Sequence, residues 1–183
     1  MPKIKILNMK RISALIIISG LTLISFFSCK SNKEEIKAPE GMRIVDMTKY
    51  GKQFLFFVPD STVGKLEILE QPGGLLQVKV GKVFDVIIKE GEEDIAFKKA
   101  DLGNDDLYKI KQFFVDEPTT IAWEWSIPDM PSEFHFLTVQ KVGNYSYTFE
   151  DNKNSDAAPF SRTNIEKMLE SCRNIKPVSK KEE

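Results

Sequence analysis

Histidine and cysteine are scarce in this chain, and their scarcity excludes several kinds of site. His135 is the only histidine among 183 residues, so a metal centre built from several imidazoles is excluded. No second histidine and no cysteine lies near it in the sequence. His135 stands between Phe134 and Phe136 in a segment with strand character, so it is expected to be a partly exposed sheet residue.

Motifs that mark common enzyme classes are also missing. No serine lies in a nucleophile-elbow pattern, and neither a phosphate-binding loop nor a dinucleotide fingerprint occurs. Gly73-Gly74 follows Pro72 and indicates a turn. Without an ordered set of nucleophile, base and metal ligands, the sequence favours a non-catalytic protein over an enzyme and implies no cofactor and no metal.

The first thirty residues form the most distinctive stretch of the chain. Residues 1–11 are basic and contain no acid, residues 12–27 are apolar apart from a few Ser, Thr and Gly, and Ser28-Cys29 precedes a polar run. A basic start, an apolar run and a small residue are typical of a secretory signal. A spanning helix needs roughly 20 apolar residues, so the shorter run favours a signal. The alternatives are an uncleaved single transmembrane helix and ordinary cleavage.

Ser28 followed at once by Cys29 resembles the signal of bacterial lipoproteins. The resemblance implies a signal peptide over residues 1–28 and a lipid on the thiol of Cys29. Phe26 and Phe27 depart from that family's pattern, which prefers a branched aliphatic residue and a small residue there. Stable anchoring needs more than one acyl chain, each contributing about 0.8 kcal/mol per buried methylene. The expected place is the outer membrane of the cell envelope, periplasmic or surface-exposed, with the membrane as partner.

The residues after Cys29 add a second signal. Lys33-Glu34-Glu35 resembles the surface-export tag of some Gram-negative lipoproteins. The alternative is that residues 29–40, rich in Lys and Glu, form only a solvated tether because they cannot bury apolar surface.

The charge balance argues against a nucleic-acid partner. Four of the 26 basic residues and none of the 27 acidic residues precede Cys29, so the chain from Cys29 onward has 22 basic and 27 acidic residues, a formal charge of −5. A mildly acidic protein does not suggest nucleic acid as a partner. If Cys29 carries lipid, Cys172 has no disulfide partner, and its place on an apolar stripe predicts a buried thiol.

Residues 41–176 are expected to form a single α+β domain, with a charged tail over 177–183. The surest helix spans 163–175, with a capping box at Thr163 and Glu166 and an apolar stripe at helical spacing. Another helix is expected from Gly91 to about 102. Residues 107–115 fit a helix or a strand, and comparison within the chain favours the strand. The strands are expected at 53–59, 65–70, 76–80, 83–89, 107–115, 121–126, 134–142 and 145–149.

These elements predict an α+β fold, a mostly antiparallel sheet of about seven or eight strands with two helices packed on one face. The last helix needs an apolar partner, and the best candidate is the sheet face that carries Trp123, Trp125, Tyr147 and Phe149. Trp123, Trp125 and Tyr145 are also candidates for a platform that binds sugars or peptides. The core interpretation is preferred because the opposite faces of those strands are small or polar.

A weak internal likeness suggests a duplication. Residues 65–75 can be aligned with 111–121, and Lys79-Val80-Gly81 recurs as Lys141-Val142-Gly143, with an insertion around 127–133 in the second half. The alternative is that hairpins reuse Pro and Gly for the same turns. In function, the sequence favours a lipid-anchored binding or envelope-maintenance module of unknown protein or saccharide ligand over an envelope enzyme that acts on saccharide or peptide material.

Overall fold

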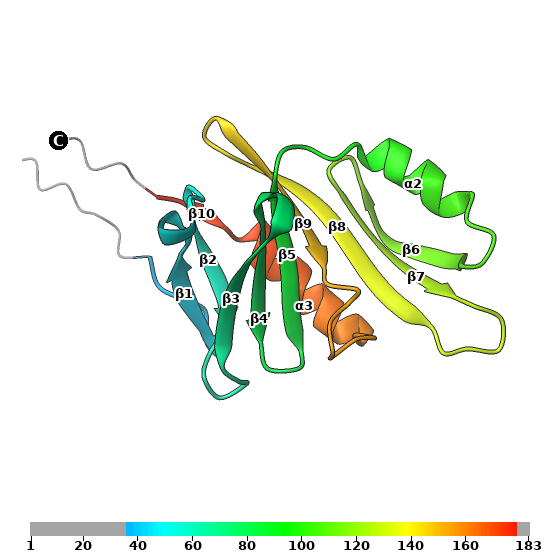
Figure 1. Cartoon of the computed structure of the whole chain (residues 1–183), viewed down its shortest axis with the longest axis horizontal. Helices are drawn as coiled ribbons and strands as arrows, with labels where there is room; N and C mark the ends of the chain where they lie inside the picture. Colours follow the sequence, from blue (N-terminus) through cyan, green and yellow to red (C-terminus); the bar gives the residue numbers. More distant parts are fainter. Residues whose placement is uncertain (1–35, 179–183) are drawn as a thin grey trace, which may run out of the picture. The chain divides into compact units, whose positions relative to one another are not determined.

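The computed structural model describes residues 36–178, which contain ten strands, two α-helices and two short 3-10 helices (Figure 1). The predicted signal peptide, Cys29, Lys33-Glu34-Glu35 and residues 179–183 of the predicted tail lie outside the described residues. The elements, in chain order, are β1 (Met42–Asp46), η1 (Met47–Tyr50), β2 (Phe54–Pro59), β3 (Leu66–Gln71), η2 (Pro72–Gly74), β4 (Leu75–Val80), β5 (Phe84–Glu90), α2 (Ile95–Gly103), β6 (Lys109–Glu117), β7 (Thr120–Ser126), β8 (Glu133–Val142), β9 (Tyr145–Asp151), α3 (Arg162–Arg173) and β10 (Lys176–Pro177).

The strands form two antiparallel sheets. Seven strands pair in the order β3-β4-β5-β9-β8-β7-β6, and a smaller sheet has the order β1-β2-β10. The predicted α+β class with a large antiparallel sheet is thus confirmed. Residues 107–115, which fitted both a helix and a strand, lie largely in β6. The apolar run at 54–58 forms β2, the central and almost fully buried strand of the small sheet.

Both helices start at caps that differ from the predicted ones. Asp94 caps α2 because its carboxylate accepts the Phe97 N–H at 2.9 Å, so the helix starts after the acidic run and not at Gly91. The predicted capping box at Thr163 and Glu166 is wrong. Ser161 has extended backbone angles and exchanges side-chain hydrogen bonds with Asn164, which starts α3 two residues earlier.

One face of the seven-stranded sheet is covered by α3 and the small sheet together. The predicted apolar stripe of α3 is buried in the main hydrophobic cluster, next to side chains from β2, β4, β5 and β9. Aromatic rings join the two sheets, as Phe54 of β2 lies 4.8 Å from Tyr147 and 5.7 Å from Phe149 between ring centroids. Most of the apolar surface of the domain is therefore buried in this one layer.

The helix α2 packs on the opposite face, so the prediction that both helices share one face is wrong. Its buried residues Ile95 and Leu102 belong to a second cluster with Trp123, Trp125 and their neighbours. Residues that pair across an antiparallel sheet point to the same face. Ala122 pairs with Phe136, and both lie in the α3 cluster. Trp123 pairs with His135, so these two side chains point to the opposite face. Of the four aromatic residues predicted to contact α3, only Tyr147 and Phe149 lie on its side.

The two halves of the chain meet at β5 and β9 in the middle of the sheet, and each half contributes a hairpin, β4–β5 or β8–β9. Gly81 and Gly143 have φ angles of 57° and 59°, the left-handed region that their turns require. If a duplication related the two halves, a twofold axis perpendicular to the sheet would relate β5 to its antiparallel neighbour β9. That axis would place α2 and α3, which follow these strands, on the same face of the sheet. Because α2 and α3 lie on opposite faces of the sheet, such an axis does not relate the two helices.

The edge strand β6 is irregular. Its pairing with β7 shifts register twice, between Ile110 and Gln112 and between Phe113 and Val115. Exposed lysines and acids occupy much of this strand.

Candidate functional site

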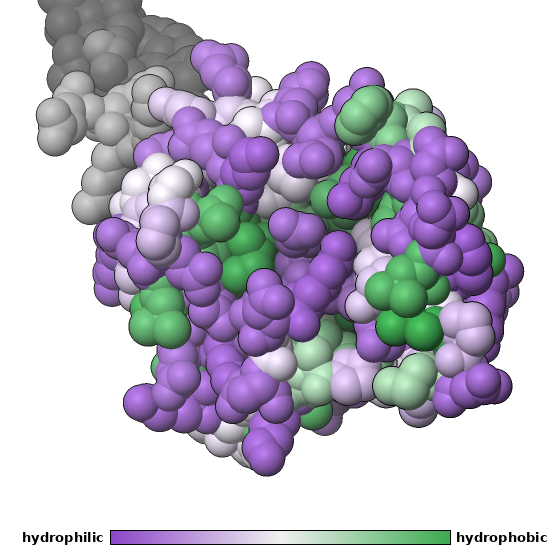
Figure 2. All heavy atoms as spheres, turned by 45° about the vertical axis from the view of Figure 1, so that its right-hand side comes forward, coloured by the Kyte–Doolittle hydropathy of each residue, from purple (hydrophilic) through white to green (hydrophobic). Residues whose placement is uncertain are grey.

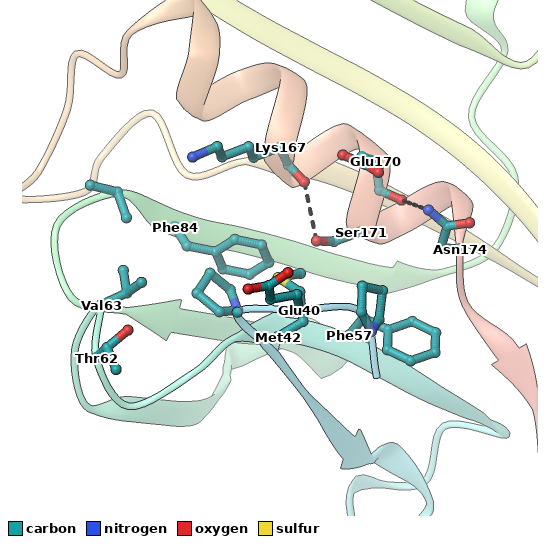
Figure 3. Close-up of a pocket in the computed structure, with 14 residues that line it drawn as sticks. Glu40, Met42, Phe57, Thr62, Val63, Phe84, Lys167, Glu170, Ser171 and Asn174 are labelled. Atoms are coloured by element: carbon teal, nitrogen blue, oxygen red, sulfur yellow. Dashed lines mark hydrogen bonds between the residues drawn. The ribbon is translucent and has the colours of Figure 1, made fainter. Parts of the chain in front are cut away.

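An apolar hollow lies at the start of the described chain. We call it the tether groove: a hollow of about 380 Å³ between residues 39–42, the loop at Thr62 and Val63, the β4–β5 hairpin and α3 (Figure 3). Met42, Phe57 and Phe84 supply apolar surface to it. A cavity of this size falls within the range of small-ligand sites, roughly 300–1,000 Å³.

The polar groups that α3 presents to the tether groove are mostly satisfied within the helix. Ser171 Oγ donates to the carbonyl oxygen of Lys167 at 3.1 Å, and Asn174 Nδ2 donates to the carbonyl oxygen of Glu170 at 3.0 Å (Figure 3). Within residues 36–178, the Lys167 ammonium has no ion-pair partner. The groove therefore offers apolar contact with a few charges on its rim, which suits an apolar chain better than a small polar molecule.

Two glycines hold the mouth of the tether groove together. A Cβ atom on Gly64 would lie 2.6 Å from Gly81 Cα, so the β2–β3 loop and the β4–β5 hairpin can meet only because both residues are glycine. The neighbouring side chains Val63 and Val83 both line the groove and are 43% and 39% exposed. Two apolar side chains thus line the groove from loops that touch at Gly64 and Gly81.

The predicted aromatic platform is only partly assembled. Trp123 and Trp125 lie together, with ring centroids 6.1 Å apart, but both are buried. Lys153 Nζ stands 5.5 Å from the centroid of each of these two rings. Tyr145 lies on the other face at the β8–β9 hairpin, where it is 46% exposed and stacks on Tyr147 at 6.3 Å. The three candidate residues therefore do not share a surface.

His135 is 4% exposed, so the prediction of a partly exposed sheet residue is wrong. Its Nδ1–H donates to Asp151 Oδ2 at 2.7 Å, and the other oxygen of that carboxylate accepts the Phe136 N–H at 2.9 Å. The pairing of β8 with β9 stops at Leu137 and Glu150, and Asp151 is the last residue of β9. The Asp151 carboxylate therefore accepts the Phe136 N–H in place of a backbone carbonyl of β9. The pairing joins residues 16 positions apart, which no local sequence pattern reveals.

The outer nitrogen of His135 is shielded. Nε2 lies 3.5 Å from Glu133 Oε2, which already accepts the Trp125 Nε1–H at 3.1 Å. Nε2 and Trp123 Nε1 are buried without a hydrogen-bond partner among the described residues. The cluster resembles the arrangement of a general base and its orienting acid, but a substrate would reach Nε2 only after neighbouring side chains moved.

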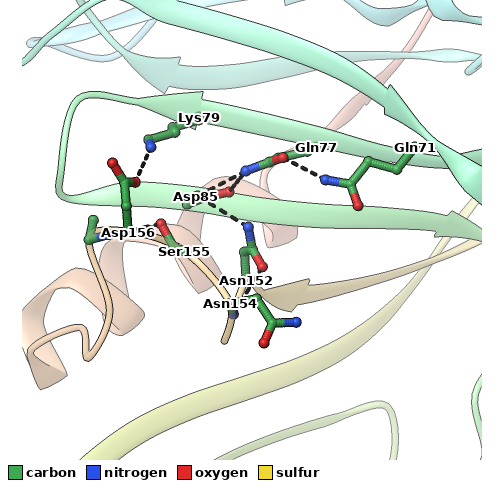
Figure 4. Close-up of polar contacts among 9 residues, drawn as sticks. Gln71, Gln77, Lys79, Asp85, Asn152, Asn154, Ser155 and Asp156 are labelled. Atoms are coloured by element: carbon green, nitrogen blue, oxygen red, sulfur yellow. Dashed lines mark hydrogen bonds and ion pairs between the residues drawn. The ribbon is translucent and has the colours of Figure 1, made fainter.

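A polar network fixes the loop after β9 to the sheet (Figure 4). Gln77 Nε2 donates to the buried Asp85 carboxylate at 2.9 Å, and Asn152 Nδ2 donates to it at 3.3 Å. Lys79 pairs with Asp156, which raises the pKa of the lysine and lowers that of the acid. These contacts hold residues 152–156 in place. Across residues 36–178, no group of three His, Cys, Asp or Glu side chains is arranged to hold a metal ion.

The surface is mostly hydrophilic, with apolar side chains gathered in separate patches on the face shown in Figure 2. Exposed large apolar residues include Phe97 on α2, Leu107 before β6 and Met130 in the β7–β8 loop. In the part of the chain that the structure describes, no helix has the length and apolarity needed to cross a bilayer.

Comparison of the chain with protein-family models, with curated proteins and with solved structures found no match.

Proposed function

We propose that this protein is a lipid-anchored component of the cell envelope, held to the outer membrane through Cys29, whose domain acts as a non-catalytic binding module. The observation that carries the proposal is Ser28-Cys29 at the end of a basic and then apolar N-terminal stretch. The domain supports a binding role because the tether groove is lined largely by apolar side chains, and the Ser171 and Asn174 side chains that line it already hydrogen-bond within α3.

An envelope enzyme that acts on saccharide or peptide material is the second candidate. One observation favours it, the short hydrogen bond between His135 and Asp151, because an orienting acid on Nδ1 prepares Nε2 to accept a proton. The burial of Nε2 weighs against it, since a general base must lie within hydrogen-bonding distance of its substrate. A His135→Gln variant that changes turnover of envelope material while folding normally would favour the enzyme.

The anchor is tested by replacing the single sulfur atom on which it depends. Cells that express Cys29→Ala are expected to lose labelling of the protein by a fatty-acid analogue and to hold an unprocessed or soluble product. Cys172→Ala is the matched control and should be labelled like the wild type, because that thiol is buried in the domain. Persistent labelling and membrane sedimentation of the Cys29→Ala protein would refute the proposal.

A further inference from the structure

We propose that the tether groove and its two valine tips form a second contact with the membrane, in which the groove takes up one acyl chain of a bilayer lipid. This inference rests on the proposed lipid anchor, because the anchor is what brings the groove to a bilayer.

The position of the groove in the chain supports this occupant. Pro39, Glu40 and Gly41, at the start of the described residues, line the groove. Cys29 precedes Pro39 by ten residues, and ten residues span at most about 33–36 Å when fully extended. A lipid on Cys29 therefore keeps the groove within this distance of the bilayer. A short tether raises the effective concentration of a linked site to the order of millimolar, so a weak apolar contact is sufficient.

The shape and chemistry of the groove mouth also support an acyl chain as the occupant. Val63 and Val83 project from two loops that the Gly64–Gly81 contact holds together, and their exposed side chains continue the apolar surface of the groove. Apolar side chains on adjoining loop tips can enter the boundary between head groups and acyl chains without changing the fold. The close approach of Gly64 and Gly81 holds the two loops that carry these valines against each other.

Lysines beside the valines are placed to remain in the head-group layer. Lys82 is exposed and precedes Val83, and the Lys65 side chain is 84% exposed. Long lysine side chains can extend to the interface while the residues beside them are buried. Glu40 and Glu170 also line the groove, so the contact depends on apolar surface and not on net charge. Zwitterionic lipid is accordingly the suitable probe.

The test uses the lipidated wild-type protein in phosphatidylcholine vesicles that contain a phosphatidylcholine with a photoreactive diazirine on one acyl chain. Vesicle flotation and the mass of the modified Cys29 peptide are measured first. After illumination, the cross-linked peptides are identified by mass spectrometry. We expect cross-links at the groove, on peptides that carry Met42, Phe57, Val63 or Val83. The β8–β9 hairpin at Asn144 is the matched internal control and should remain unmodified.

A double variant, Val63→Asp with Val83→Asp, should lower cross-linking at the groove several-fold while flotation and melting temperature stay close to those of the wild type. Both valines are partly exposed, so these changes do not place a charge in the core. If the wild-type protein isolated from cells carries no lipid on Cys29 and does not float, the proposed anchor is refuted. A lipidated, floating protein without groove cross-links would overturn the inference and leave the anchor standing. Cross-links that arise only from a diazirine fatty acid incorporated at Cys29, or that join two copies of the chain, would also overturn it.

Discussion

Replacing Leu169 with alanine should destabilise the domain strongly, because α3 covers the main core. Leu169 is 3% exposed and lies in the hydrophobic cluster where α3 packs against β2, β5, β8 and β9. Buried Leu→Ala substitutions cost about 2–5 kcal/mol, a large share of the roughly 5–15 kcal/mol by which domains are stable. For a domain of this size, each kcal/mol lowers the melting temperature by about 3 °C. The expected loss is therefore about 6–15 °C.

Thermal unfolding followed by circular dichroism measures this loss, and urea denaturation gives the corresponding free energy. Glu170→Ala is the matched control, one residue along the same helix, where the side chain is exposed. Exposed substitutions usually change stability by at most about 0.5 kcal/mol. Equal losses at Leu169 and Glu170, or no loss at Leu169, would mean that α3 does not pack on the sheet as described.

Three further predictions concern other parts of the chain. Cys172 is fully buried, and burial raises the pKa of its thiol well above the ordinary value, so a thiol reagent should label it slowly in the folded protein and quickly in denaturant. Burial also raises the pKa of Glu150 above its ordinary 4.5, so this acid favours folding below pH 4.5 and opposes it once the pH exceeds the raised pKa. Glu150→Gln should therefore stabilise the protein at pH 7 and lose that advantage near pH 4, whereas an equal effect at both pH values in urea titrations would contradict this. Replacing Lys33-Glu34-Glu35 with three alanines should make the protein resistant to protease added to intact cells, and unchanged digestion would argue against the surface-export interpretation.

Local patterns were sufficient to predict most of the elements. The continuous apolar run Phe54–Pro59 and the apolar stripe of α3 each lie within one segment of the sequence. Both are buried, as their apolar patterns indicate. The strand character of residues 107–115 emerged only from comparison with another part of the chain. Helix starts were predicted less well, because caps depend on backbone angles at one residue, such as the extended Ser161.

The face covered by each helix could not be predicted from the sequence, because it depends on the register between strands. A shift of one residue moves every side chain to the other face, and no pattern within β7 shows that Ala122 pairs with Phe136. The sequence predicted that the sheet face carrying Trp123 and Trp125 would pack against α3. That face instead packs with Ile95 and Leu102 of α2.

The hollows could not be predicted for a related reason. The tether groove combines Pro39, Val63, Val83 and Lys167, which come from four distant parts of the chain. Glycine composition marks turns, but the near contact of Gly64 with Gly81 exists only in the folded domain. Cys29, the residue on which the proposed anchor depends, lies outside the described residues.

Under the proposed lipid anchor, the irregular edge strand β6 has a further consequence. Anchored molecules share a thin layer, where they meet far more often than the same number would in solution. A regular exposed strand under such crowding would invite neighbouring copies to extend the sheet from one molecule to the next. The two register shifts in β6 interrupt its row of free backbone groups, and Lys109 and Lys111 place charge along it. This edge is therefore poorly suited to growth into a fibre, and copies can stand close together without joining there.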